Sequence, residues 1–343
     1  MATKLIHPSA GVVAGSALVI DYILTIAVSV ASGIDALFSF IPVEYHYYKL
    51  PCSILAVSLL IILNLRGVKE SIKVLLPIFA VFIITHLVML VAALMQSKEA
   101  LPGFMADVIP QTKGLIQNIG IGAFVIIILK SYSHGAGTYT GIEAVSNALP
   151  TLQEPKAQTG KTTMLYMALS LAILSGSLLI FYGMMGVVKM PGKTLNAALF
   201  ERVVQFWQTP LGSWLVILTL ASEAALLFVA AQTGFIGGPQ VMSNMALDYW
   251  MPRRFAHLSE RLTTSNGILF MGLSAIGIIL VTQGHVAFLV VLYSINVFIT
   301  FSLSQFGMCR HWLEVRKQSR KWILKLAINF IGLLLTITVL VIL

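Results

Sequence analysis

Long apolar runs separated by short polar stretches follow one another along the whole chain. Most of these runs have the length that a helix needs to cross about 30 Å of hydrocarbon. The pattern therefore predicts an all-α polytopic membrane protein with about nine transmembrane helices. The predicted spans are residues 9–40, 50–65, 71–96, 118–150, 161–188, 210–236, 266–283, 285–309 and 322–343.

Composition and charge support this interpretation. The 343 residues are 58% hydrophobic and only 10% charged, which is not typical of soluble globular domains. The net charge of +9 lies in short loops between apolar runs, a pattern of membrane orientation that argues against nucleic-acid binding. Fifteen of the 22 Lys and Arg residues fall in one set of alternate loops and six in the other. We therefore expect a multi-pass protein of the cell (inner, cytoplasmic) membrane with a cytoplasmic N-terminus.

The fourth predicted span, 118–150, contains a cluster of glycines near its middle. Glycine inside a helix costs about 1 kcal/mol relative to alanine, so the cluster predicts a break over residues 134–141. The glycines are Gly135, Gly137 and Gly141. Thr140 and Glu143 lie at this break, and secondary transporters build substrate or ion sites at broken helices. The alternative is a bent helix in which glycines allow close packing, with Glu143 as a helix cap.

The first span carries a polar stripe. Asp21, Thr25 and Ser29 are spaced four residues apart and share one helix face, with Tyr22 beside them. A carboxylate at mid-membrane depth costs several kcal/mol unless it faces a partner or a wet cavity. The stripe therefore indicates either an ion or substrate path or a structural hydrogen bond to a neighbouring helix.

Other polar positions lead to further expectations. Tyr293, Asn296 and Thr300 share one face of the eighth span, as a cavity lining or as interhelical hydrogen-bonding groups. Residues 97–117 contain two prolines and are expected to form an outer loop. Residues 242–260 are amphipathic and predict a helix on the cytoplasmic surface, within one membrane domain that comprises residues 1–343.

Enzymatic and cofactor-dependent functions find no support in the sequence. The segment T-G-K-T-T at 159–163 suggests a phosphate-binding loop, but Pro155 stands where that motif requires glycine. The two cysteines, Cys52 and Cys309, lie in or beside apolar runs without metal-binding spacing. We expect no enzyme, no cofactor and no metal centre.

Several motifs together resemble the amino acid–polyamine–organocation (APC) superfamily of secondary transporters. The likeness is nearest to its KimA-type branch of potassium importers. The motifs are I-D-Y-I-L-T-I-A-V-S at 20–29, T-G-I-E-A-V-S-N at 140–147, A-A-x-T-x-F-x-x-x-P at 230–239, A-x-D-x-x-x-P at 246–252, S-N-G-I at 265–268, L-Y-S-I-N-V-F at 292–298 and S-L-S-Q-x-G-M-x-R-H-W at 302–312.

The resemblance implies a five-plus-five inverted-repeat fold of the LeuT type, of which this chain would supply the third to eleventh helices. The break at 134–141 would then be that of the sixth helix. The resemblance also implies the residues of the ion path and the proton-coupling site. These are Asp21, Tyr22, Thr25, Ser29, Thr140 and Tyr293 for the ion, and Glu143 for the proton.

These expectations define three functional hypotheses. The first is a permease for proton-coupled potassium uptake, because the oxygens of the stripe suit a hard cation. The second is an amino acid permease, in which half-helix N–H groups bind the substrate carboxylate. The third is an inert fragment, because the resemblance implies that the first, second and twelfth helices and a cytosolic C-terminal region are missing. The lipid bilayer is the expected partner, and a homodimer is left open.

Overall fold

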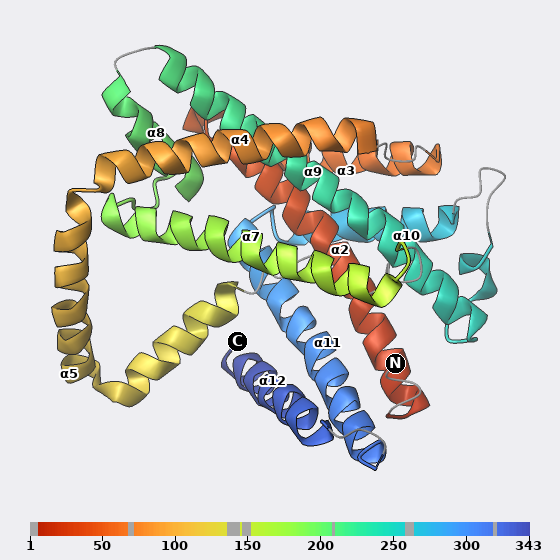
Figure 1. Ribbon diagram of the computed structural model, residues 1–343. Helices are drawn as coiled ribbons and strands as arrows, with labels where there is room; N and C mark the ends of the chain where they lie inside the picture. Colours follow the sequence, from red (N-terminus) through yellow and green to blue (C-terminus); the bar gives the residue numbers. More distant parts are fainter. Residues whose placement is uncertain are drawn as a thin grey trace.

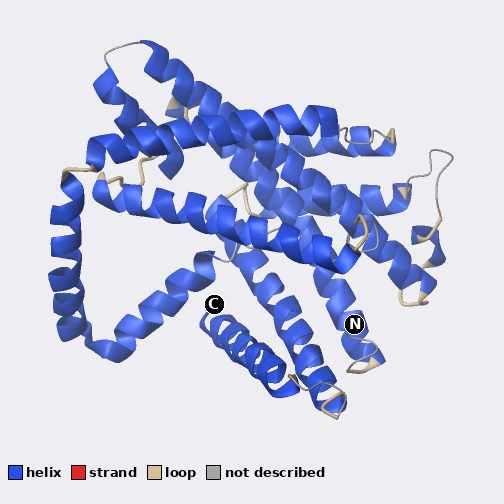
Figure 2. Ribbon diagram, in the orientation of Figure 1, coloured by secondary structure: helices blue, strands red, loops and turns tan. Residues whose placement is uncertain are grey.

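The protein is α-helical throughout the part that the computed structural model describes (Figure 2). The described residues are 6–67, 72–135, 145, 152–207, 210–257, 264–317 and 321–343. The helices are α2 (Pro8–Phe38), η1 (Val43–Tyr48), α3 (Lys49–Leu65), α4 (Ile72–Ser97), α5 (Ala100–His134), α7 (Lys156–Met184), α8 (Leu195–Val204), η4 (Gln205–Trp207), α9 (Pro210–Leu247), η5 (Arg253–Phe255), α10 (Ser265–Val281), α11 (Val286–Glu314) and α12 (Trp322–Ile342).

Eight helical segments among the described residues are long and apolar enough to cross a membrane. The seventh predicted span, 266–283, corresponds to α10, which has 17 residues and is too short to be counted among these eight. That length is at the lower limit for a membrane-spanning helix. The all-α polytopic class predicted from hydropathy is therefore confirmed.

Helix α2 is the central element and packs against α3, α9, α10 and α11. It runs obliquely through the molecule and crosses α9, as the red helix of Figure 1 shows. The main hydrophobic core joins Tyr22 and Ile26 of α2 to Phe235 of α9 and Met271 of α10. Polar side chains on α2 are consequently placed inside the helix bundle.

Glycines on α9 allow this close packing. A methyl group at Gly237 would lie 2.7 Å from the hydroxyl oxygen of Tyr22, and one at Gly234 would lie 2.7 Å from the Tyr22 carbonyl oxygen. Both distances are shorter than any ordinary carbon–oxygen contact, so only glycine lets the backbones of α2 and α9 approach in this way.

A second core lies where α4, α7 and α8 meet α9. Met89, Phe200 and Leu220 are fully buried there. The short helix α8 begins at Thr194, whose hydroxyl oxygen accepts a hydrogen bond from the Ala197 amide at 3.2 Å. This N-cap starts the helix at the point where it packs against α9.

The expectation of an outer loop at 97–117 was wrong, because α5 begins at Ala100. Pro102 does not prevent the helix, since it lies in the first turn, where the backbone N–H has no partner within the helix. The irregularity occurs instead at Gly120, whose φ of +81° kinks α5. Figure 1 shows the two arms of α5 meeting at an angle.

Two further segments differ from the boundaries that the sequence indicated. Residues 242–247 continue α9 instead of starting a separate surface helix, and Pro239 lies inside that helix. The described part of the segment 242–260 then contains the short η5 turn. At the predicted break, α5 ends at His134 with Gly135 as its C-cap, while residues 136–141 lie outside the described residues.

Candidate functional site

The polar stripe of α2 is fully enclosed by the surrounding helices. Asp21, Thr25 and Ser29 are between 1% and 4% exposed, and Tyr22 is 2% exposed. They lie in the middle two-thirds of the 31-residue helix α2. Its most apolar stretch of 18 residues has a mean hydropathy of 2.0. A carboxylate and two hydroxyl groups are thus held at membrane depth away from lipid, as a functional or a hydrogen-bonding site requires.

One side of the stripe faces α11. The side-chain amide of Asn296 donates to the carbonyl oxygen of Ala17 at 2.5 Å, and Leu24 packs in a small cluster with Tyr293. Ala17 and Leu24 are one turn before and about one turn after Asp21 on the same face of α2. The structure therefore brings Asp21 and Tyr293, which are far apart in sequence, to the same interface between α2 and α11.

The other side of the stripe faces α9. Tyr22 packs against Gly237, and Ile26 packs against Gly234. Thr25 and Ser29 follow Asp21 at intervals of four residues, which places them between the α11-facing and the α9-facing sides of α2. The four predicted residues of α2 are therefore brought together along one buried strip of the helix.

The oxygens of this strip have the chemistry of cation ligands. The Thr25 hydroxyl donates to the Asp21 carbonyl oxygen at 2.9 Å, which leaves its oxygen lone pairs as acceptors. Carboxylate, hydroxyl and carbonyl oxygens are the ligands that hard cations prefer. The strip can thus contribute oxygens of these kinds to a dehydrated cation.

Several predicted site residues fall on the segment after α5. Gly135 is the C-cap of that helix and keeps right-handed helical dihedral angles, φ −74° and ψ −3°. Gly137, Thr140, Gly141 and Glu143 lie outside the described residues. Their roles at the helix break and in proton coupling stay predictions.

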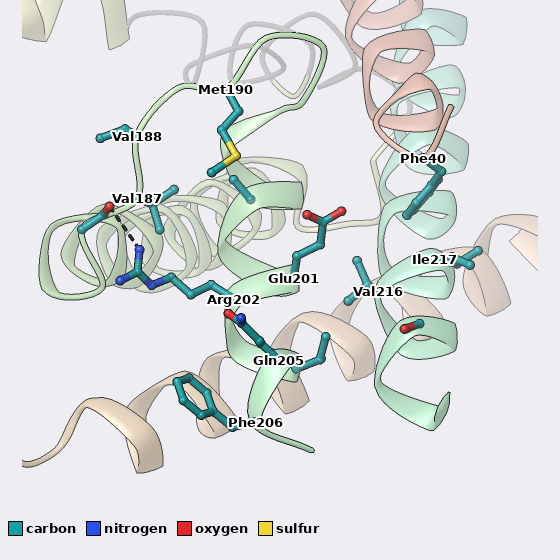
Figure 3. A pocket seen from close by; sticks show the side chains of 14 residues that line it. Phe40, Val187, Val188, Met190, Glu201, Arg202, Gln205, Phe206, Val216 and Ile217 are labelled. Atoms are coloured by element: carbon teal, nitrogen blue, oxygen red, sulfur yellow. Dashed lines mark hydrogen bonds between the residues drawn. The ribbon is translucent and has the colours of Figure 1, made fainter. Parts of the chain in front are cut away.

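A pocket of about 910 Å³ lies elsewhere, between α8, the first turns of α9 and the segment 186–190 (Figure 3). Arg202 donates to the Gly186 carbonyl oxygen at 3.5 Å, and Glu201 pairs with Lys193 at 2.5 Å. None of the predicted site residues within the described ranges lines this pocket. It is a separate feature from the α2 strip.

The sequence analysis missed a second group of buried polar residues, in the core around α4. His86 of α4 is 1% exposed, and its Nε2 atom lies 3.8 Å from a carboxylate oxygen of Glu223 in α9. The available signal was a histidine and a carboxylate in the middle of two apolar spans. Such positions mark functional groups in membrane helices, but their pairing depends on tertiary contacts.

The fold and the buried polar strip define a class: an all-α, multi-pass membrane protein with polar groups enclosed between its helices. Within that class the chain belongs to the amino acid permease family, whose family model matches residues 1–343. The predicted resemblance to the APC superfamily is thereby confirmed.

A curated relative places the chain more narrowly. The chain is 36% identical over 335 residues to the potassium transporter KimA of Bacillus subtilis (strain 168). The alignment covers 97% of this chain and 53% of that relative, so the chain spans about half the length of the curated relative it matches. The predicted likeness to the KimA-type branch is also confirmed.

Proposed function

We propose that this chain provides the ion path of a secondary active permease that takes up potassium across the cell membrane. The observation that carries the proposal is the buried strip on α2, where Asp21, Thr25 and Ser29 are at most 4% exposed. A negative carboxylate beside hydroxyl oxygens suits a monovalent hard cation, and the similarity to a protein named a potassium transporter supports that choice.

In this proposal Asp21 supplies the negative charge that compensates for the lost hydration of the ion. Tyr22, Thr25, Ser29, Thr140 and Tyr293 supply the remaining oxygens. The burial of Tyr293 against Leu24 supports its place beside the α2 strip. Glu143 takes up the coupling proton, and the N-terminus faces the cytoplasm.

An amino acid is the second candidate substrate, because the matching family model is described as that of amino acid permeases. Such a substrate would need N–H groups for its carboxylate and acceptors for its ammonium group. The Asp21 carboxylate would then bind the ammonium group instead of a metal ion.

Thermal unfolding of the purified chain in lipid nanodiscs distinguishes the two substrates. A ligand that binds only the folded state raises the free energy of unfolding by an amount that grows with the logarithm of ligand concentration above its Kd. Potassium chloride should raise the unfolding temperature progressively with its concentration, compared with sodium and choline chloride at equal ionic strength. A panel of amino acids should leave it unchanged.

Stabilisation by an amino acid and none by potassium would reject the potassium proposal. The absence of any shift with either ligand would support the third hypothesis, an inert fragment. Uptake by liposomes that contain the chain is the corresponding test of transport itself.

A further inference from the structure

A cluster of four polar side chains lies in the second core, apart from the α2 strip. Each residue comes from a different helix: His86 from α4, Tyr182 from α7, Asn196 from α8 and Glu223 from α9. In Figure 1, α4, α8 and the start of α9 lie in the upper part of the view, and α7 runs below them. Because all four helices contribute, the cluster exists only in the folded protein.

Hydrogen bonds determine which groups of the cluster donate. The Asn196 amide nitrogen lies 3.0 Å from both carboxylate oxygens of Glu223, and the Tyr182 hydroxyl donates to the Asn196 amide oxygen. Together these contacts fix the orientation of the Asn196 amide. Glu223 therefore accepts hydrogen bonds from Asn196.

His86 also lies beside Glu223, and its ring has a defined orientation. Its Nδ1 atom lies 2.9 Å from the Phe82 carbonyl oxygen, which can only accept a hydrogen bond, so Nδ1 carries a hydrogen. The ring is held between Phe82 and Phe200, with ring centroids at 4.0 and 5.5 Å. The remaining nitrogen, Nε2, lies 3.8 Å from Oε2 of Glu223.

Besides the hydrogen on Nδ1 of His86, this arrangement favours one further proton on the His86–Glu223 pair. If the ring were neutral and Glu223 ionised, the unprotonated Nε2 would lie 3.8 Å from a negative oxygen inside a largely apolar core, where such repulsion is poorly screened. We propose that His86 and Glu223 together hold one exchangeable proton, either on Nε2 of the histidine ring or on the carboxyl group of Glu223. They form a protonatable site outside the proposed ion path, and this inference does not depend on the transport proposal.

The charged groups on the neighbouring described elements are engaged elsewhere, so a proton is the positive charge that remains for Glu223. Among the described residues, His86 is the basic side chain found within 4.0 Å of the Glu223 carboxylate. On neighbouring elements, Glu201 pairs with Lys193 and Asp35 pairs with Lys49, while Arg202 donates to a backbone carbonyl. Helix α10 has no charged residue, and Asp21 lies on the side of α2 toward α11.

The pair has unequal access to its surroundings. The Glu223 side chain is 17% exposed, whereas the His86 side chain is 1% exposed. Glu223 is therefore the more accessible end of the pair, and the histidine is the inner end. This geometry accommodates a proton and needs no space for a larger ligand.

Spectroscopy on the whole purified chain tests the proposal directly. Nitrogen NMR of protein labelled with ¹⁵N-histidine reports the protonation of each ring nitrogen, and infrared spectroscopy reports the carbonyl stretch of a protonated carboxyl group. At neutral pH we expect either a doubly protonated His86 or an Nδ1-protonated His86 with a protonated Glu223.

Variants assign the signals. Glu223→Gln should abolish the infrared band or convert His86 to its neutral form, and His86→Gln should remove the corresponding resonance. Glu201→Gln and His285→Gln are matched controls that should change neither signal of the pair. If His86→Gln does not fold, variants of the other six histidines assign the His86 resonance by elimination.

Two outcomes would overturn the proposal. One is a neutral His86 together with an ionised Glu223 at every pH at which the chain is folded. The other is a His86 ring protonated at Nε2 with a bare Nδ1, because the facing atoms would then need no additional proton.

Discussion

The side-chain amide of Asn296 in α11 donates a hydrogen bond of 2.5 Å to the backbone carbonyl of Ala17 in α2. These residues are 279 positions apart, and the bond lies one helical turn before Asp21. It joins the helix that carries Tyr293 to the helix that carries the polar strip. Of the two interpretations of Asn296, the interhelical hydrogen bond is the one that the structure displays.

Replacing Asn296 with alanine should lower the free energy of unfolding by about 1 kcal/mol, a value typical of interhelical hydrogen bonds in membranes. Unfolding by a denaturing detergent measures this change. Thr300→Ala is the control, because Thr300 bonds to Val297 within its own helix and should have a smaller effect. Equal effects of the two substitutions would contradict a specific role for the Asn296–Ala17 bond.

Replacing Gly237 with alanine should destabilise the protein by about 1–3 kcal/mol, the usual effect of overpacking a core. The added methyl group would lie 2.7 Å from the Tyr22 hydroxyl oxygen and force that side chain to move. Thermal unfolding measures the loss.

The matched control for this substitution is Gly277→Ala in α10, where an added methyl group meets nothing within 4 Å. This variant should gain up to about 1 kcal/mol, because alanine favours a helix more than glycine does. A destabilised Gly277→Ala protein, or an unchanged Gly237→Ala protein, would show that the close packing of α2 and α9 is not the cause.

Replacing Asp21 with asparagine should weaken potassium binding at least tenfold, which corresponds to about 1.4 kcal/mol. Asparagine keeps the shape of the side chain but removes its negative charge, so insertion into the membrane should be retained. The potassium dependence of the unfolding temperature measures the effect.

Asp35→Asn is the control for the Asp21 substitution. Asp35 lies near the C-terminal end of the same helix and pairs with Lys49 at 2.6 Å, away from the strip. Its replacement should leave the potassium dependence unchanged. Full potassium stabilisation in the Asp21→Asn protein would make Asp21 a structural residue only.

Replacing Thr194 with alanine should loosen helix α8 by about 1 kcal/mol, the typical value of an N-cap. The Thr194 hydroxyl accepts a hydrogen bond from the Ala197 amide. The backbone N–H of Thr194 donates to the Ser39 hydroxyl at 3.1 Å. Hydrogen exchange of the α8 amides should accelerate about fivefold. Thr194→Ser should exchange like the parent protein, and faster exchange in that variant as well would argue against the cap.

Periodicity alone determined much of the membrane-spanning architecture and of the α2 strip. A carboxylate and two hydroxyl residues at intervals of four must share a face of any helix, whatever surrounds it. Likewise, long apolar runs must become spans, because water cannot satisfy their backbone groups inside a bilayer. These conclusions need only local geometry and the properties of the solvent.

Tertiary structure decided which faces meet. Helical spacing places Asp21 beside Thr25, but only packing brings Tyr293 of α11 to the same interface and Glu223 of α9 to within 3.8 Å of His86. Helix ends depended on packing as well: the predicted span ended at residue 236, yet α9 continues through Pro239, which packs against Gly267 of α10. The helix propensity of a single glycine or proline amounts to about 1–3 kcal/mol, which contacts from distant parts of the chain can outweigh.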